Sequence, residues 1–147
     1  MPAGYEDPVV GFSFKLEIQG KVTGYFTDIS GLGSEHEVVE FKATDENGND
    51  VVHQVPGRLK WNPVTLKRGI TTSMDIWQWR AMVEKGDIKG ARSNGSITAL
   101  DQQGSPVAQW DFQNAWPSKV SGPQFQSDSN SFAVEELTIV FEYIERV

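Results

Sequence analysis

The chain has 147 residues and a formal net charge of −7 at pH 7. A chain of this length buries enough apolar surface to fold without disulfides, and we expect one domain over residues 1–147. The absence of cysteine excludes disulfides, thiolate metal sites and a cysteine nucleophile. The acidic balance disfavours binding to a phosphate backbone, and without an apolar run of about 20 residues we expect no membrane insertion.

The first part of the chain predicts a series of antiparallel strands. An arm over residues 1–11 is rich in Gly and Pro and is a candidate assembly element. It precedes alternating apolar and polar residues that predict a strand over 12–18. Turn residues then separate two further runs of strand-forming residues, 22–30 and 34–42. Three such runs in succession predict a meander, in which each strand pairs with the next.

Residues 43–60 are polar and contain two turn signals, the cluster at 45–50 and the pair Pro56-Gly57. This composition predicts a long loop or a mobile hairpin. Connections of this length are uncommon in compact domains unless they are disordered or used for contact, so the segment is a candidate assembly element. A mobile hairpin without a partner is the alternative.

A strand over 64–69 is expected to lead into the one helix of the chain. Thr72 lies three residues before Asp75, which predicts an N-terminal capping box, and Gly86 is placed to end the helix. Three apolar residues recur at helical spacing between these limits and predict the buried face. They are Ile76, Trp79 and Val83.

The remaining sequence again predicts strands, at 96–100 and 107–112 around a turn at 101–106, and at 133–146 after a polar loop at 127–131. The last of these has apolar residues on both faces, which predicts a second cover besides the core, such as a neighbouring subunit. The expected fold is therefore mainly β, an antiparallel barrel or sandwich with one packed α-helix.

No motif in the sequence carries catalytic chemistry. His36 and His53 lack the spaced partners of a metal site, and no pattern of a nucleophile elbow, zinc protease or phosphate-binding loop is present. Pairs of glutamates are frequent in so acidic a chain and are mostly solvated. We therefore predict no catalytic residue, no cofactor and no metal.

The five tryptophans allow one alternative function. Trp61, Trp110 and Trp116 lie near expected turns or strands, where they could stack on sugars in a carbohydrate- or protein-binding β-sandwich module. Large aromatic side chains are more often part of the core, and packing is the favoured interpretation.

Five segments, taken in chain order, resemble the tail tube protein family of contractile phage tails. This family also supplies the inner tubes of tailocins and extracellular contractile injection systems, and its fold is similar to the haemolysin-coregulated tube protein of type VI secretion. The resemblance covers residues 8–145. The segments are Phe26-Thr27-Asp28-Ile29-Ser30-Gly31-Leu32, Pro56-Gly57, Val64-Thr65-Leu66-Lys67-Arg68-Gly69, Trp77-Gln78-Trp79-Arg80 and Asn114-Ala115-Trp116-Pro117-Ser118-Lys119.

The resemblance implies a structural subunit that forms hexameric rings, stacked into a hollow tube inside a contractile sheath. Its implied partners are further copies, the sheath protein, baseplate or tube-initiator and cap proteins at the ends, and a cargo of DNA or effector protein. Assembly in the bacterial cytoplasm, followed by a place in a virion or a phage tail-like particle, is also implied. Main tube and tube initiator, and phage, tailocin and injection system, remain alternatives.

Two hypotheses about site residues extend this resemblance. The runs 22–30 and 34–42 are expected to form a hairpin facing the lumen, lined by acidic side chains that repel a sliding acidic cargo. The segment 43–60 is expected to contact adjacent subunits or stacked rings. The lumen candidates are Glu35, Glu37 and Glu40, and the contact candidates are Asp45, Glu46, Asn47, Asn49, Asp50 and Arg58.

Overall fold

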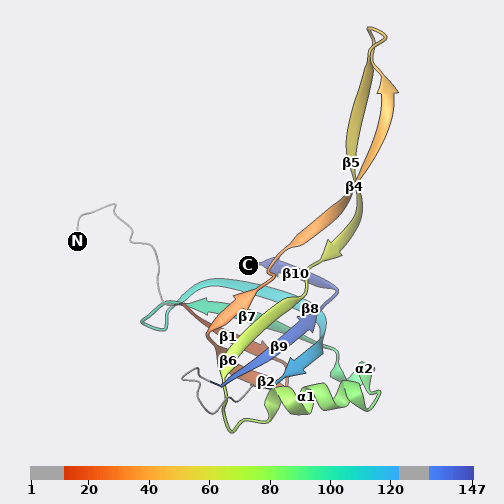
Figure 1. The fold of residues 1–147 in the computed structure, drawn as a ribbon. Helices are drawn as coiled ribbons and strands as arrows, with labels where there is room; N and C mark the ends of the chain where they lie inside the picture. The colour runs from red at the N-terminus through yellow and green to blue at the C-terminus, as the bar shows by residue number, and fades with distance from the viewer. Residues whose placement is uncertain (1–11, 123–132) are drawn as a thin grey trace, which may run out of the picture.

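The computed structural model describes residues 12–122 and 133–147, so the predicted arm at 1–11 and loop at 127–131 lie outside the described residues. The described elements are ten strands and two helices (Figure 1). They are β1 (Ser13–Ile18), β2 (Val22–Phe26), β3 (Asp28–Ser30), β4 (Ser34–Thr44), β5 (Asp50–Trp61), β6 (Val64–Gly69), α1 (Asp75–Glu84), α2 (Ile88–Ala91), β7 (Ser93–Leu100), β8 (Pro106–Ser121), β9 (Val134–Val140) and β10 (Tyr143–Arg146).

Eight of these strands form one antiparallel sheet that closes into a barrel. Hydrogen-bonded neighbours follow the order β2-β1-β7-β8-β9-β6-β3, and β10 also pairs with β8. The two ends of this order, β2 and β3, are separated along the chain only by Thr27, whose N–H donates to the Lys67 carbonyl at 2.9 Å. This stretch thus pairs with β1 through its first half and with β6 through its second. The prediction of an antiparallel β-fold with a packed helix is confirmed.

β8 is longer than the predicted strand over 107–112 because it continues through a bend. Its first part pairs with β7 and β10, and residues 116–121 pair with β9. Asn114 lies at the change of partners with φ +54°, a left-handed conformation that asparagine tolerates better than most residues. The bend lets one strand contribute to both halves of the barrel.

Alternate residues of the strands fill the barrel, and the helices cover one end of it. Leu16, Leu66 and Leu137 are fully buried on three different strands. On α1, Ile76 and Trp79 are buried as predicted, and the Trp79 indole N–H donates to the Ala91 carbonyl of α2 at 2.7 Å. The short helix α2 was not predicted, since four residues are too few to show a helical period.

The ends of α1 follow the sequence prediction only in part. The predicted capping box is wrong, because Met74 occupies the N-cap position, no side chain caps the helix and Thr72 lies outside it. The Asp75 carboxylate instead accepts hydrogen bonds from the N–H of the next residue, Ile76, and from the Arg68 guanidinium. At the other end Gly86 has φ +88° and ends the helix as predicted.

The predicted last strand over 133–146 consists of two strands, and this corrects the inference of an outside cover as far as it rested on Ile144; Val140, on the other face of β9, is half-buried. β9 buries Leu137 and Ile139, and Phe141 is buried at its end. The chain then breaks before β10, and the break moves burial from odd to even positions, so that Ile144 is buried in the same core. The change in alternation therefore results from the break, and Ile144 needs no neighbouring subunit to cover it.

β4 and β5 pair only with each other and project from the barrel as a long hairpin (Figure 1). The predicted hairpin of 22–30 with 34–42 is wrong, because β2 pairs with β1 and β3 with β6. Of the two alternatives for 43–60, the loop is wrong and the hairpin is closer, since β5 occupies 50–61 and pairs with β4. Pro56 hid this strand in the sequence, but an edge strand accepts a residue without an N–H.

The turn between β4 and β5 lies inside the polar cluster that the sequence singled out. The Asp45 carboxylate accepts hydrogen bonds from the N–H groups of Asn47 at 2.9 Å and Asn49 at 2.8 Å. Gly48 takes φ +82°, a conformation that favours glycine. The turn signal was therefore correct, and the error lay in the length assigned to the connection.

Arg68 joins the helix to the barrel through a buried set of polar contacts. Its guanidinium donates to Asp75 at 2.7 Å and to Glu135 at 3.2 Å, and lies 5.1 Å from the centre of the Phe26 ring. The Trp77 indole N–H donates to the second Glu135 oxygen at 3.0 Å. These side chains come from β2, β6, α1 and β9, so one cation connects four elements.

The charge of Arg68 also determines how Asp75 ionises. Burial by itself would raise the pKa of Asp75, but the hydrogen bonds from Arg68 and from the Ile76 N–H outweigh burial and hold this pKa below its ordinary value. Asp75 therefore stays charged, and the network depends on its one cation.

Arg68→Met leaves Asp75 and Glu135 without their cation. Since removal of one partner of a buried ion pair costs about 3–5 kcal/mol, we expect the free energy of unfolding to fall by about that amount. Urea denaturation of the unassembled chain, followed by tryptophan fluorescence, measures it. Lys67→Met on the exposed side of β6 is the control, with an expected change within about 0.5 kcal/mol. Equal losses in the two variants would contradict the assignment.

Candidate assembly interface

The β4–β5 hairpin exposes apolar side chains that a single subunit does not cover. Val38 is 64% exposed, Val52 57% and Phe41 48%. A strand of 11 residues such as β4 extends roughly 36 Å at about 3.3 Å per residue. A two-stranded sheet of this length has no core of its own, so burial of its side chains requires another molecule.

The strand register divides the hairpin into two faces of different character. Residues that pair across the strands share a face, and alternate residues lie on opposite faces. We call one the apolar face; beyond the bulge it carries Val39, Phe41, Ala43, Val51, His53 and Val55. We call the other the mixed face; it carries Val38, Glu40, Lys42, Thr44, Asp50, Val52, Gln54 and Pro56.

Side-chain contacts agree with this division. The Phe41 and His53 rings stack on the apolar face with their centres 5.1 Å apart. On the mixed face, the Gln54 amide donates to the Glu40 carboxylate at 3.4 Å. His53 is thus a surface side chain beside an aromatic ring.

The three predicted lumen residues are exposed, but they do not share a face. Glu35 and Glu37 lie on the same side of β4 as Val39, the side of the apolar face, because these residues are two positions apart. Glu40 lies on the mixed face. The register shifts opposite Glu37, where Gly57 and Arg58 face one residue of β4. A surface lined by one face of this hairpin therefore cannot present all three carboxylates.

The predicted contact residues fall into two groups. Five of them surround the turn, and Arg58 lies in the bulge near the base of the hairpin. All are exposed except Asp45, which is half-buried and accepts the two hydrogen bonds of the turn. Whether these residues contact another subunit remains a prediction.

Sequence reasoning missed the most extended part of this surface, the unpaired outer edges of β4 and β5. In a two-stranded sheet each strand has one edge whose N–H and C=O groups have no ladder partner. The alternation within 50–55 was the available signal, and the surrounding polar residues obscured it.

The base of the hairpin is fixed to the barrel by an aromatic contact. The ring of Trp61, the last residue of β5, meets Tyr143 of β10 edge to face, with centres 5.5 Å apart. On the β4 side, Gly31 has φ +92°, and a Cβ there would collide with the Pro63 carbonyl. Both connections between hairpin and barrel are therefore constrained.

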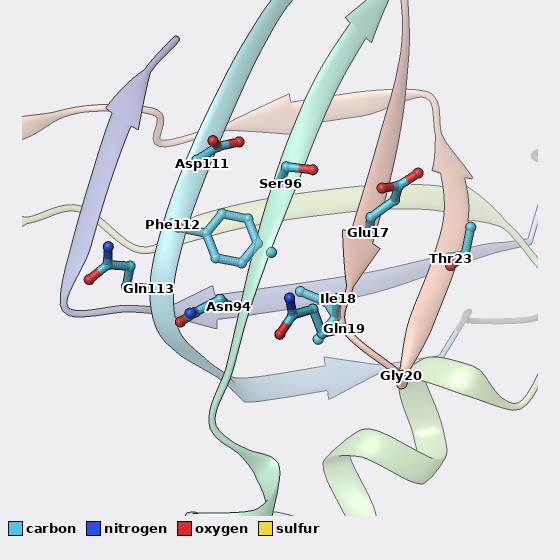
Figure 2. A pocket seen from close by; sticks show the side chains of 11 residues that line it. Glu17, Ile18, Gln19, Gly20, Thr23, Asn94, Ser96, Asp111, Phe112 and Gln113 are labelled. Atoms are coloured by element: carbon cyan, nitrogen blue, oxygen red, sulfur yellow. The ribbon is translucent and has the colours of Figure 1, made fainter.

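A polar hollow of about 490 Å³ opens on the solvent side of β1, β7 and β8 (Figure 2). Its carboxylates have partners on the sheet: Glu17 lies 2.7 Å from Lys15, and Asp111 accepts from the Gln109 amide at 2.9 Å. No histidine lines it. Ser96 lies between Glu17 and Asp111 in the strand register, so the hydroxyl groups of the hollow have carboxylates but no histidine beside them.

The tryptophans do not form an exposed platform for sugars. Trp79 is buried, and the other four are half-buried. Trp110 lies beneath Arg146, whose guanidinium is 5.8 Å from the ring centre. This arrangement does not favour the carbohydrate-binding alternative.

Within residues 12–122 and 133–147, His, Asp and Glu side chains form no group of three or more that could hold a metal ion. None of the helices in these residues has the length and apolar character needed to cross a bilayer.

The chain matches the family model described as T4-like virus tail tube protein gp19 over residues 10–145. No curated protein sequence matches it significantly. Among solved structures, it is similar to a chain of the PVC sheath–tube complex of an extracellular contractile injection system in the extended state. That match has a TM-score of 0.76 and 22% identity, and covers 99% of this chain and 93% of the other.

Two further solved structures share the fold. A chain of the anti-feeding prophage cap aligns with a TM-score of 0.74 and 21% identity, covering 100% of this chain and 94% of the other. Hcp1 from Flavobacterium johnsoniae aligns with a TM-score of 0.54 and 16% identity, covering 90% and 93%.

Trp61→Ala removes the aromatic contact at the base, so we expect the hairpin to take a wider range of directions. Because the chain has no cysteine, spin labels at Asn47→Cys in the turn and Lys85→Cys beyond α1 report one distance. Double electron–electron resonance should show a broader distribution in the Trp61→Ala variant. Leu59→Ala, an exposed position on β5, is the control and should leave the width unchanged. A width unaffected by Trp61→Ala would rule out this role.

Proposed function

The chain belongs to the T4-like virus tail tube protein family, and we propose that six copies form a ring and that rings stack into the hollow inner tube of a contractile particle. Its role in this proposal is structural, with no catalytic step. The observation that carries the proposal is the β4–β5 hairpin, which combines two unpaired edges with exposed apolar side chains on both faces.

Ring formation supplies what the isolated hairpin lacks. Hairpins of adjacent copies placed edge to edge pair the free N–H and C=O groups of β4 and β5. In a closed ring every such edge is paired, as in a β-barrel. The number six rests on the resemblance to the tail tube family.

One face of the joined hairpins lines the lumen in this proposal. By the register, that face carries Glu40 or the pair Glu35 and Glu37, but not all three. The exposed residues of the turn then contact the adjacent subunit or the next ring, where charges orient partners more than they strengthen binding.

The remaining partners follow from the place of a tube in such a particle. We propose a sheath protein outside the tube, baseplate or tube-initiator and cap proteins at its ends, and DNA or effector protein as passive cargo in the lumen. The support is a shared fold with chains of a sheath–tube complex and of a tube-terminating cap. We further propose assembly in the bacterial cytoplasm, before the particle acts as a virion or a phage tail-like device.

A shortened hairpin tests whether the β4–β5 hairpin drives assembly. Val38 pairs with Pro56 across the hairpin, so residues 39–55 can be replaced by Asn-Gly, which forms a tight two-residue turn. We expect the shortened chain to keep its barrel, measured by circular dichroism and thermal unfolding, and to sediment as single subunits. The unsubstituted chain is expected to form rings and tubes under the same conditions. Normal tubes from the shortened chain would refute the proposal.

A further inference from the structure

The two strands of the hairpin carry opposite net charge. β4 contains Glu35, Glu37 and Glu40 against one basic residue, Lys42, a net charge of −2. β5 contains one acidic residue and two basic ones, a net charge of +1. The basic residues are Arg58 and Lys60, next to the base of the hairpin.

Four of these charges, all near the base, lie together on one side of the hairpin but are not paired within it. Glu35 is opposite Lys60 in the register, and Arg58 lies in the bulge opposite Glu37. All four side chains are exposed. Among the described residues, the ion pairs within 4 Å all lie in the barrel or at its helix, and none involves β4 or β5.

A second copy of the chain can complete these pairs. When two hairpins point the same way, β5 of one copy lies antiparallel beside β4 of the next, as β5 lies beside β4 within one chain. The same register then brings the basic residues of one copy opposite the acidic residues of the other. The two edges are complementary, so the contact is head-to-tail and repeats around a ring.

We propose that Arg58 and Lys60 of each copy pair with Glu35 and Glu37 of the next copy, and that this charge match fixes which edges join and in what register. This inference rests on the ring assembly proposed above. The wrong joint, β4 against β4, would bring six glutamates together and is disfavoured by repulsion. Glu35 and Glu37 thus belong to the joint between copies, which leaves Glu40 and the mixed face for the lumen.

Two charge-reversed variants test the pairing without depending on contacts inside one chain. In Glu35→Lys/Glu37→Lys both edges near the base are basic, and in Arg58→Glu/Lys60→Glu both are acidic. We expect each variant alone to lose ring assembly, measured by sedimentation and negative-stain microscopy. An equimolar mixture should restore it, because the two chains can alternate around a ring with an even number of subunits. Within each hairpin the facing charges still have the same sign in the mixture, so only pairing between copies accounts for the rescue.

Glu84→Lys and Lys85→Glu, exposed charges at the end of α1, serve as control variants. Each is expected to assemble alone. Assembly of either hairpin variant alone, or a mixture of folded variants that stays unassembled, would overturn the pairing. If the control variants also fail to assemble alone and assemble when mixed, the rescue is a general effect of net charge, and this would overturn the pairing too. Failure of the unsubstituted chain to form rings would instead count against the proposed function.

Discussion

The β4–β5 hairpin has two strands and no layer behind it, so beyond its base the side chains face solvent or another molecule. Val38, Val52 and Phe41 are among the exposed large apolar residues described, and the outer edges of the hairpin leave backbone groups without ladder partners. Together these features are a liability in a lone subunit and an asset in a closed ring. The rest of the molecule is a platform that holds the β4–β5 hairpin in a fixed direction.

The barrel provides that platform through two joints of different chemistry. Arg68 links four elements through one buried cation, so the end of the barrel that carries α1 depends on its charge. At the other joint, Trp61 meets Tyr143, and the Gly31 backbone passes close to the Pro63 carbonyl. Only the second joint orients the hairpin, and in the proposed ring this orientation reduces the entropy that assembly must overcome.

Local signals in the sequence predicted the parts of the fold that depend on near neighbours. The Asp45–Asn49 turn, the helix stop at Gly86 and the buried side of α1 were correct because turn chemistry and helical period act within a few residues. The partner of β4, the role of Arg68 and the break before β10 depend on contacts far along the chain. The resemblance to a family identified the function, whereas the face of each glutamate required the register around the bulge at Glu37.

Electron cryo-microscopy of the purified, unsubstituted chain at increasing concentration tests the central claim most directly. The account predicts stacked rings with a hollow centre, six copies in each ring, and each hairpin paired along both edges with those of its neighbours. A chain that stays a single subunit at every concentration, or rings in which β4 and β5 keep free edges, would contradict it.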